Sequence, residues 1–398
     1  MSTNKISLSE NFQTLSSSII SEAFISPAKS QNVIKLKQPK TAVVYCEANF
    51  AKIDGKTANG LVRYSEKYKI IAVFYSEKTQ QDSGLALGEA ENGIPICGNL
   101  TEAIKINGGI PDYYIFGIAP ASGMLSKKER KLVLEAIGLG INIVNGLHEF
   151  LNDDIVFSTA CKAMKVEILD IRKPRPKNDL RVFSGRINDI SSKRIAILGT
   201  DCAIGKRTTA VILTRALNKY GLKTILISTG QTGLIQGFRY GVSMDAVPSQ
   251  FCAGELEAVI LEAFDGEEPD VIIIEGQGAL SHPAYSTSSF ILRGSVPDGV
   301  ILQHAPGRKH RCDFEKMTMP EPLKEINLIQ TFSDTKVIGL TINHEDMKNN
   351  EIDEAIVFYK KQLGLPTTDA LTRSPDELVE MVLDAFPELE EKAKAVLN

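Results

Sequence analysis

Several features that would place this chain in a specialised class of protein are absent. Its six cysteines stand singly along 398 residues, and no two of them form a C-x-x-C pair. This spacing argues against both a zinc site and a disulfide framework, and it favours reduced thiols. No apolar run approaches the roughly 18 to 20 residues that cross a bilayer. We therefore expect no bound metal and no contact with a membrane.

A surplus of one charge is absent as well. Lysine and arginine number 45 and aspartate and glutamate 49, which gives a formal net charge of -4. Such a balance offers no basic surface for nucleic acid. The N-terminal residues MSTNKISLSENF lack the basic-then-apolar order of a secretory signal. We expect a cytoplasmic enzyme that binds small-molecule substrates, does not bind nucleic acid and assembles as a homo-oligomer.

What the chain does contain is an alternation of short apolar runs with helix-like stretches. Apolar strands that alternate with helices are typical of parallel sheets covered on both faces, so the predicted fold class is α/β. The predicted strands are 42–45, 70–74, 113–116, 141–144, 194–198, 223–227, 271–274, 299–303 and 336–342. The predicted helices are 127–138, one from about Lys206, 254–264, and an acidic amphipathic helix from Ser374 onward.

A linker divides this alternation into two domains. The segment DIRKPRPK at 170–177 is dense in proline and charge, which is typical of a link between domains. Residues 1–35 are rich in Ser, Asn and Gln, and we interpret them as an extension. The predicted organisation is an extension at 1–35, one parallel-sheet domain at 36–175 and a second at 176–398.

The stretch IAILGTDCAIGKRTTA at 195–210 has the order of a phosphate-binding loop, with a strand, a glycine-bounded turn and a helical start. Gly199 permits a sharp exit from the strand, Gly205 permits close approach of an anion, and Lys206 supplies a charge. The alternative is a glycine-rich turn that binds nothing. A polyphosphate ligand is the interpretation that the strand-before, helix-after context favours.

The loop departs from the pattern G-x-x-x-x-G-K-[ST] in two ways. Five residues separate Gly199 from Gly205, and Arg207 stands where a hydroxyl residue normally binds Mg²⁺. Asn343, after the strand 337–342, could read a base edge or could simply close a turn. The predicted ligand-binding residues are Gly199, Asp201, Gly205, Lys206, Arg207, Thr208, Thr209 and Asn343.

Two further segments carry polar residues to the ends of predicted strands. The strand VIIIEGQG at 271–278 ends in Glu275, which could face a metal or a water, or could cap the next turn. The segment STGQTG at 228–233 suits a polar ligand at the carboxyl edge of a parallel sheet. The predicted substrate-binding residues are Thr229, Gln231, Thr232, Gln277, Ser281 and Arg308.

Histidines are few, and His282 follows the Glu275 segment closely. The position of His282 is equally consistent with a general base and with a structural histidine. For His148, the structural role is the favoured interpretation. Glu275 and His282 are the predicted catalytic residues.

Six phrases of the sequence, in consistent order, resemble the D-glutamate N-acetyltransferase family over about 40–380. The phrases are GIAPASG (117–123), GLHEFLNDD (146–154), DIRKP (170–174), GTDCAIGKRTT (199–209), TGQTG (229–233) and EGQGALSHPAY (275–285). The resemblance implies a Rossmann-like N-terminal domain followed by a P-loop NTPase-like domain similar to dethiobiotin synthetase.

The resemblance also implies a reaction in which an acetyl group moves from acetyl-CoA to the amine of D-glutamate. The phosphate loop would then bind the diphosphate of coenzyme A without cleaving it. Because a diphosphate that is not hydrolysed needs no Mg²⁺ ligand, Arg207 is compatible with this reaction. The amides of 276–278 could bind the thioester oxyanion. Partners for the two carboxylates of the acceptor could be Arg63, Arg172, Arg308 or Lys309.

Two alternatives to this reaction stay open. One is an ATP-Mg²⁺-dependent ligase or kinase like dethiobiotin synthetase, which the phosphate loop and the Glu275 strand favour and Arg207 opposes. The other is a non-catalytic nucleotide-binding switch, for which the separate first domain offers little support.

Overall fold

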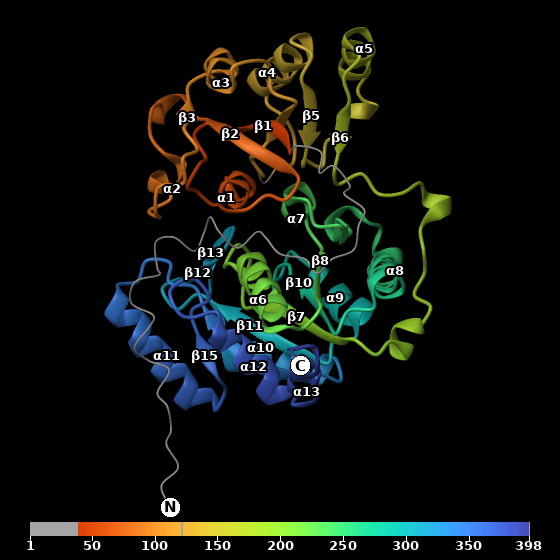
Figure 1. Cartoon of the computed structure of the whole chain (residues 1–398), viewed down its shortest axis with the longest axis vertical. Helices are drawn as coiled ribbons and strands as arrows, with labels where there is room; N and C mark the ends of the chain where they lie inside the picture. Colours follow the sequence, from red (N-terminus) through yellow and green to blue (C-terminus); the bar gives the residue numbers. More distant parts are fainter. Residues whose placement is uncertain (1–38, 121, 398) are drawn as a thin grey trace, which may run out of the picture. The chain divides into compact units, whose positions relative to one another are not determined.

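The computed structural model of the chain contains two parallel sheets, each with helices packed against it (Figure 1). The structure describes residues 39–120 and 122–397, so the predicted extension at 1–35 lies outside the described residues. Within this part of the chain, no helix combines the length and the apolar composition needed to cross a bilayer.

The first sheet has six strands in the order β3-β2-β1-β4-β5-β6, and every pair is parallel. This is the strand order of the doubly wound dinucleotide-binding fold. Its strands are β1 (Lys40–Tyr45), β2 (Tyr68–Phe74), β3 (Ile96–Cys97), β4 (Tyr113–Phe116), β5 (Asn142–Asn145) and β6 (Ile168–Asp170). Its helices are α1 (Lys56–Arg63), α2 (Ser83–Ala86), α3 (Leu100–Asn107), α4 (Lys127–Gly138) and α5 (Ile155–Met164).

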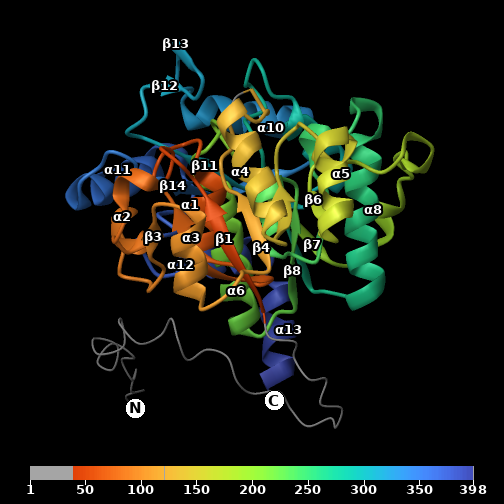
Figure 2. The ribbon, with the colours of Figure 1, turned by 90° about the horizontal axis from the view of Figure 1, so that it is seen from above.

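The second sheet has seven parallel strands in the order β15-β14-β11-β7-β10-β8-β9. Its strands are β7 (Lys193–Gly199), β8 (Thr224–Ser228), β9 (Tyr240–Gly241), β10 (Val271–Glu275), β11 (Gly299–His304), β14 (Lys336–Ile342) and β15 (Thr367–Thr368). An antiparallel hairpin of β12 (His310–Arg311) and β13 (Phe314–Thr318) projects away from it (Figure 2).

Helices pack on this sheet along its whole length. They are α6 (Lys206–Tyr220), α7 (Gln231–Gln236), α8 (Ser249–Glu267), α9 (Thr287–Ser295), α10 (Pro322–Phe332), α11 (Asn349–Leu363), α12 (Asp376–Ala385) and α13 (Glu388–Leu397). Short 3-10 turns occur at Ser76–Lys78, Leu151–Asp153, Lys177–Asp179, Arg186–Asp189 and Met244–Ala246.

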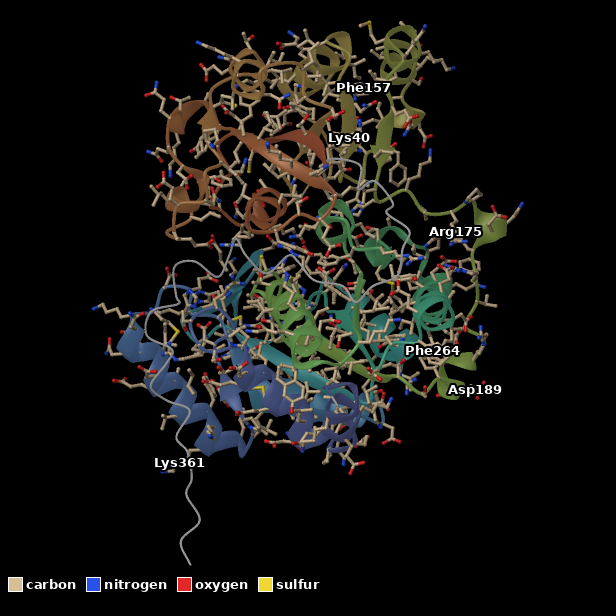
Figure 3. All side chains as sticks on the ribbon, in the orientation of Figure 1. Lys40, Phe157, Arg175, Asp189, Phe264 and Lys361 are labelled. Atoms are coloured by element: carbon tan, nitrogen blue, oxygen red, sulfur yellow. The ribbon has the colours of Figure 1, made fainter. Side chains whose placement is uncertain are left out.

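The strands form where they do because both faces of each sheet are covered. The central strands β7 and β10 contain continuous runs of buried apolar residues, at 195–198 and 271–274, as strands covered on both faces require. In the first domain Phe157, labelled in Figure 3, is fully buried, and the Arg130 guanidinium lies 4.6 Å from its ring centroid. Each sheet therefore has its own hydrophobic core.

The α/β fold with two parallel sheets confirms the predicted fold class, and all nine predicted strands occur within one or two residues of their predicted bounds. The predicted single helix from Ser374 onward is wrong. Two helices, α12 and α13, are interrupted at Phe386 and Pro387, because proline has no amide hydrogen and disfavours a helical residue before it. The shortest strands, such as β9 and β15, were not predicted.

Segments that follow the carboxyl ends of both sheets contact one another. The Thr57 hydroxyl of α1 lies 2.8 Å from the Thr232 hydroxyl of α7, and the Gln236 amide donates to the Gly60 carbonyl. The Arg172 guanidinium, just after β6, pairs with Asp245. Because ligands of parallel sheets bind at the carboxyl ends of the strands, these contacts bring α1 to the place where a ligand of the second sheet is expected.

Candidate functional site

The phosphate loop spans the turn from Gly199, the last residue of β7, to Lys206, the first residue of α6. Gly205 adopts φ 99°, a left-handed conformation that favours glycine. A Cβ on Gly199 would lie 3.0 Å from the Gln303 carbonyl oxygen, so that position also requires glycine. No side chain caps the start of α6, which leaves its first amides available to an anion.

Lys206 is buried, and its ammonium donates to the Asp201 carbonyl oxygen of the same loop at 2.5 Å. Burial lowers the pKa of this lysine. Within the described part of the chain this is the one hydrogen bond of the ammonium, which has three N–H donors and so keeps capacity for an incoming anion. The structure therefore places the Lys206 ammonium in the loop, and its role as the charge that binds a phosphate stays a prediction.

Arg207 is a half-buried cation to which no partner is given by residues 39–120 and 122–397. Among the described residues, no hydrogen bond or ion pair involves its guanidinium, although burial lowers its pKa and the charge of Glu275 opposes that shift. A Cβ built on Gly60 of α1 would lie 2.5 Å from Arg207 Nη2 and 3.2 Å from the Thr232 methyl group. Arg207 therefore lies between α1 and α7 with its five donors free for an anion.

The neighbouring polar residues brace the loop. The Thr209 hydroxyl donates to Gln303 Oε1 at 2.6 Å, and Asn343 Nδ2 donates to the Ile204 carbonyl oxygen at 2.9 Å. Thr208 is half-buried, and no hydrogen bond to its hydroxyl occurs within residues 39–120 and 122–397. Of the two threonines, only Thr208 therefore has a hydroxyl hydrogen that it could donate to a ligand without breaking a hydrogen bond of the described structure.

Glu275 ends β10 beside the carboxyl end of β8. Its Oε2 accepts from the Ser228 hydroxyl at 2.7 Å and from the Thr229 amide at 3.1 Å. The Thr229 hydroxyl donates to the Glu275 carbonyl oxygen, and Gln277 Nε2 donates to the Thr229 carbonyl oxygen. The structure thus brings the predicted residues Glu275, Thr229 and Gln277 into one hydrogen-bond network.

The start of α7 carries the next two predicted residues. Gln231 is buried, and its Nε2 has no hydrogen-bond partner in the described part of the chain. A Cβ on Gly146, which follows β5 of the first sheet, would lie 3.3 Å from the Gln231 side chain. A buried donor without a partner is costly, and a bound ligand would satisfy it. Thr232 instead pairs with Thr57.

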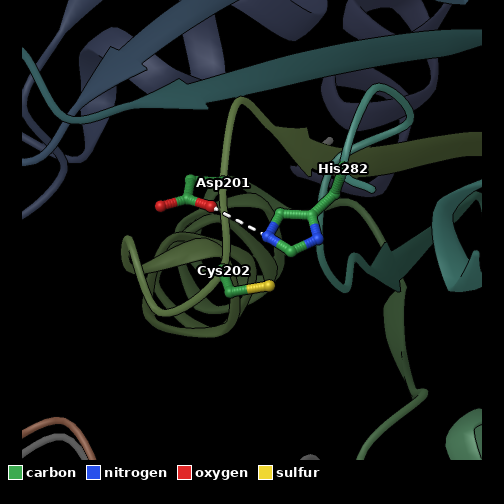
Figure 4. A group of neighbouring side chains, drawn as sticks. All are labelled: Asp201, Cys202 and His282. Carbon is green, nitrogen blue, oxygen red and sulfur yellow. Dashed lines mark ion pairs between the residues drawn. The ribbon is translucent and has the colours of Figure 1, made fainter. Parts of the chain in front are cut away.

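Three side chains converge beside the phosphate loop, as Figure 4 shows for Asp201, Cys202 and His282. The His282 and Asp201 side chains are fully buried, and His282 Nε2 lies 3.5 Å from Asp201 Oδ1. Neither of these two atoms makes a hydrogen bond in the described structure. One ligand atom from each of the three residues lies within 4.8 Å of the others. Burial lowers the pKa of His282, and Asp201 opposes the shift.

The cations predicted to bind substrate carboxylates mostly have protein partners. Arg308 donates to Asp201 Oδ2, to the carbonyl oxygens of Cys202 and Ala203, and to Glu345, so it holds the loop from outside. Arg172 pairs with Asp245 and Arg63 with Glu89, whereas Lys309 is exposed. In contrast to these three arginines, Arg207 has a guanidinium with no partner among the residues that the structure describes.

Ser281 is also occupied by protein partners. Its hydroxyl donates to Glu325 Oε2 and accepts from Arg311, and its amide donates to Glu325 Oε1 at 3.2 Å. These bonds fix the segment that carries His282.

Sequence reasoning missed three contributors to the site. Cys202 lies inside the phosphate-loop motif, and that position could have identified it as a site residue. It was overlooked because the cysteines were considered only as possible pairs. Thr57 and Gly60 come from α1, far away in the sequence. No local pattern could identify them, because their place at the site arises from contact between two domains.

The fold and the site together define a class: a phosphate-loop domain joined to a Rossmann-ordered domain. Residues 181–379 match the family model described as Domain of unknown function (DUF1611_C) P-loop domain. Residues 76–174 match the companion model, Domain of unknown function (DUF1611_N) Rossmann-like domain. The chain belongs to the DUF1611 family, which confirms the predicted resemblance together with the relatives described next.

Two curated relatives carry the name D-glutamate N-acetyltransferase. The protein from Pseudoalteromonas sp is 31% identical over 304 residues, which are 75% of this chain and 87% of that relative. The protein from Tritonibacter scottomollicae is 30% identical over 276 residues, 67% of this chain and 79% of that relative. A crystal structure of a DUF1611 family protein from Anabaena variabilis has a TM-score of 0.79 at 29% identity, covering 87% of this chain and 99% of that chain.

Proposed function

We propose that this protein transfers an acetyl group from acetyl-CoA to the amine of D-glutamate. The observation that carries the proposal is Arg207, whose guanidinium has no partner in the described part of the chain and stands where nucleotide-hydrolysing loops hold a Mg²⁺-binding hydroxyl. A permanent cation there, in place of a Mg²⁺-binding hydroxyl, suits a site that binds an anionic acceptor beside the phosphate loop and does not hydrolyse a nucleotide. The two curated relatives named D-glutamate N-acetyltransferase support the same reaction.

Different residues of the site bind the two anionic substrates. The start of α6 and Lys206 form a cradle for a diphosphate, the group that coenzyme A carries. Arg207 lies beside α1 and α7, and its planar fork suits a carboxylate of the acceptor. The Glu275 carboxylate, held by Ser228 and Thr229, takes the proton that the acceptor ammonium must lose before it can attack.

The test is a direct assay with acetyl-CoA and each enantiomer of glutamate. Two carboxylates held in a fixed frame allow one enantiomer to place its amine correctly, so D-glutamate should be acetylated at least ~100-fold faster than L-glutamate. Released coenzyme A and N-acetylglutamate are both measured. Equal rates with the two enantiomers, or no acetylation of either, would contradict the proposal that this protein acetylates D-glutamate.

A second candidate is an ATP-Mg²⁺-dependent ligase or kinase, which the phosphate loop and Glu275 at the end of β10 favour. Arg207 opposes it, because it stands where such enzymes carry a Mg²⁺-binding hydroxyl. Under the acetyltransferase proposal, turnover persists when a chelator removes Mg²⁺. Loss of turnover in chelator with recovery on added Mg²⁺ would support the ligase or kinase instead.

Ligand-dependent melting gives an independent comparison of the candidates. A ligand at 100 times its Kd stabilises the folded state by about 2.7 kcal/mol. We expect acetyl-CoA to stabilise the protein more than ATP-Mg²⁺ or ADP at equal concentration. The reverse order would favour a nucleotide enzyme or a nucleotide-binding switch.

A further inference from the structure

The amide group of Gln231, the first residue of α7, is buried with an unpaired donor. Gln231 is 6% exposed, and its Nε2 has no hydrogen-bond partner within the part of the chain that the structure describes. A buried donor without a partner raises the free energy of the folded protein, so each such group in a native protein requires an explanation. Because the terminal torsion of a glutamine is soft, the amide can turn towards a ligand at little cost.

The first domain borders Gln231 with its backbone. A Cβ built on Gly146 would lie 3.3 Å from Gln231 Cγ, and Gly146 opens the phrase GLHEFLNDD, which directly follows β5. The Arg172 guanidinium donates to the Gly146 carbonyl oxygen and pairs with Asp245, which fixes this segment at the carboxyl edge of the first sheet. The Gly146 segment therefore limits how far the Gln231 side chain can shift.

A second unpaired donor group, the Arg207 guanidinium, lies close to Gln231. A Cβ on Gly60 of α1 would lie 2.5 Å from Arg207 Nη2 and 3.2 Å from the methyl group of Thr232, the residue after Gln231. The Thr232 hydroxyl is fixed by the Thr57 hydroxyl at 2.8 Å. No hydrogen bond or ion pair of the Arg207 guanidinium occurs among the described residues. One cationic and one neutral donor are therefore available where α1, α6 and α7 meet.

The proposed base, Glu275, lies against the start of α7. A Cβ on Gly230 would lie 3.8 Å from Glu275 Oε1, and a Cβ on Gly233 would lie 3.0 Å from Glu275 Oε2. Gln231 stands between these two glycines, so it belongs to the segment that covers the carboxylate. Burial lowers the pKa of Arg207 and the charge of Glu275 opposes that shift, which agrees with a short distance between the two charges.

We propose that Gln231 is a specificity-determining residue, whose amide donates to the side-chain carboxylate of the acceptor while Arg207 binds the carboxylate beside the amine. This inference rests on the proposed function. In an α-amino acid the amine and the α-carboxylate share one carbon atom, so a cation beside the base binds the carboxylate that accompanies the reacting amine. The side-chain carboxylate is then left for the neutral donor, Gln231.

This arrangement selects the length of the acceptor as well as its charge. Glu275 is held by Ser228 and Thr229, and Gln231 is limited by Gly146, so the base and the amide are two fixed points. Aspartate is one methylene shorter than glutamate and cannot span the same two points with its amine and its side-chain carboxylate. A neutral acceptor of the right length leaves the Gln231 donor unpaired, and a site built around such a donor rejects it.

The test compares D-glutamate with D-norvaline, in which a methyl group replaces the side-chain carboxylate. Gln231→Met keeps the length of the side chain and removes its donor, so it should lower kcat/KM for D-glutamate by ~10 to 100-fold. The same variant should change kcat/KM for D-norvaline less than ~3-fold, because that acceptor has no group for the lost donor. Arg207→Met should instead lower both values by similar factors, since both acceptors carry the α-carboxylate.

Thermal melting distinguishes a ligand contact from a structural one. Gln231→Met replaces an unpaired buried donor by an apolar group of similar volume, so without ligand its melting temperature should equal or exceed that of the wild type. In the presence of coenzyme A, D-glutamate should raise the melting temperature of the wild type and raise that of Gln231→Met much less. A buried water that satisfies Gln231 Nε2 is the competing explanation, which predicts a lower melting temperature and equal losses of kcat/KM for both acceptors.

Gln231→Glu should reverse the preference for the acceptor. The added carboxylate repels the side chain of D-glutamate and accepts from the side-chain amide of D-glutamine. Therefore kcat/KM for D-glutamate should fall ~100-fold or more, and D-glutamine should become the better acceptor. Gln330→Glu adds the same charge at the opposite edge of the sheet, where Gln330 Oε1 accepts from the Val337 amide near the start of β14. This control should leave the ratio of the two acceptors unchanged.

The outcomes distinguish the inference from the function on which it rests. Acetylation of D-glutamate that Gln231→Met leaves within ~3-fold of the wild type, or that it lowers equally for D-norvaline, would overturn the role of Gln231 and leave the acetyltransferase intact. A melting shift by D-glutamate that Gln231→Met removes, without any acetylation, would preserve the dicarboxylate site and overturn the reaction. If D-glutamate neither stabilises the protein nor reacts, both are wrong.

Discussion

The carboxyl edges of the two sheets differ in what they bury. Around the first sheet, the buried polar residues are few, such as Thr57, Ser83 and Asn145. Along the second, buried polar and charged side chains lie at the end of nearly every strand. They are Thr200, Asp201, Lys206, Thr209, Ser228, Thr229, Gln231, Thr232, Glu275, His282, Gln303, His304, Thr341, Thr368 and Asp369. Burying such groups is unfavourable unless they are paired, so the carboxyl edge of the second sheet requires hydrogen-bond partners, from the protein or from a ligand, for many more groups than the first.

The unpaired atoms make the same distinction. In the first domain, the buried polar atoms without a partner among the described residues are the hydroxyls of Tyr68 and Tyr114. In the second domain there are six such atoms: Asp201 Oδ1, His282 Nε2 and Gln231 Nε2 belong to segments around the candidate site, and the other three are Gln236 Oε1, Thr335 Oγ1 and Thr368 Oγ1. We infer that the reacting groups lie at the carboxyl edge of the second sheet. The first domain contributes helix α1, which borders the site on one side and is called its wall below. Four predictions test this division.

The largest effect should come from Glu275→Gln. Removing the carboxylate that deprotonates the acceptor should lower kcat by ~10² to 10⁴-fold, while the amide keeps the hydrogen bonds from Ser228 and Thr229. Saturating steady-state rates measure it. The matched control is Glu257→Gln, a buried glutamate of α8 that accepts the Ser184 and Ile187 amides, which should lower the melting temperature and leave kcat unchanged. A kcat within a few-fold of wild type for Glu275→Gln would show that the base lies elsewhere.

Lys206→Ala should act mainly on binding of the acyl donor. A charge-assisted hydrogen bond contributes about 1.5 to 3 kcal/mol, so the KM for acetyl-CoA should rise by ~10 to 100-fold, with a smaller change in kcat. Lys219→Ala, on the exposed last turn of the same helix, is the control and should leave KM unchanged. A drop in kcat at unaltered KM would contradict the assignment of Lys206 to the donor phosphates.

His304 makes the second sheet sensitive to acid. Burial lowers its pKa to about 4, and its ring contacts the Thr200 hydroxyl at 2.9 Å and the Tyr359 hydroxyl at 3.2 Å. Because the unfolded chain binds this proton with a pKa near 6.5, the stability is fully present above pH 6.5 and is lost as pH falls. Between pH 7 and pH 5 the loss is about 2 kcal/mol.

Urea unfolding at several pH values between 7 and 5 measures this slope. His304→Gln should be less stable at pH 7 and should lose about 2 kcal/mol less of its stability on acidification. His310→Gln, at an exposed position of the hairpin, should retain the wild-type slope. An unchanged slope in His304→Gln would mean that other groups cause the acid sensitivity.

The sequence predicted the second sheet and its loop better than the wall that faces them. Strands β7 and β10 and the loop between Gly199 and Lys206 are continuous in sequence, so periodicity and glycine spacing identify them. The contact of Thr57 with Thr232 joins residues 175 positions apart, and no local pattern encodes it.

Side-chain roles were harder to predict than positions. Arg308 and Asn343 lie at the site, yet their donors are used within the protein. Arg308 donates to the Cys202 carbonyl oxygen and to the Glu345 carboxylate, and Asn343 donates to the Ile204 carbonyl oxygen. Sequence identifies a cation near a phosphate loop, but only the geometry distinguishes a paired cation from Arg207.

The smallest effect should come from Gly60→Ala, which tests the wall directly. A Cβ there would lie 2.5 Å from Arg207 Nη2, so the flexible end of Arg207 must shift, while the alanine favours α1 by up to about 1 kcal/mol. The melting temperature should hold or rise as the KM for D-glutamate increases ~3 to 10-fold, a cost of about 0.7 to 1.4 kcal/mol in binding. Gly138→Ala, at the end of α4 with open space around its Cβ, should leave both KM values unchanged. If Gly60→Ala also leaves the KM for D-glutamate at the wild-type value, α1 does not bound the acceptor site, and the first sheet does not serve as its wall.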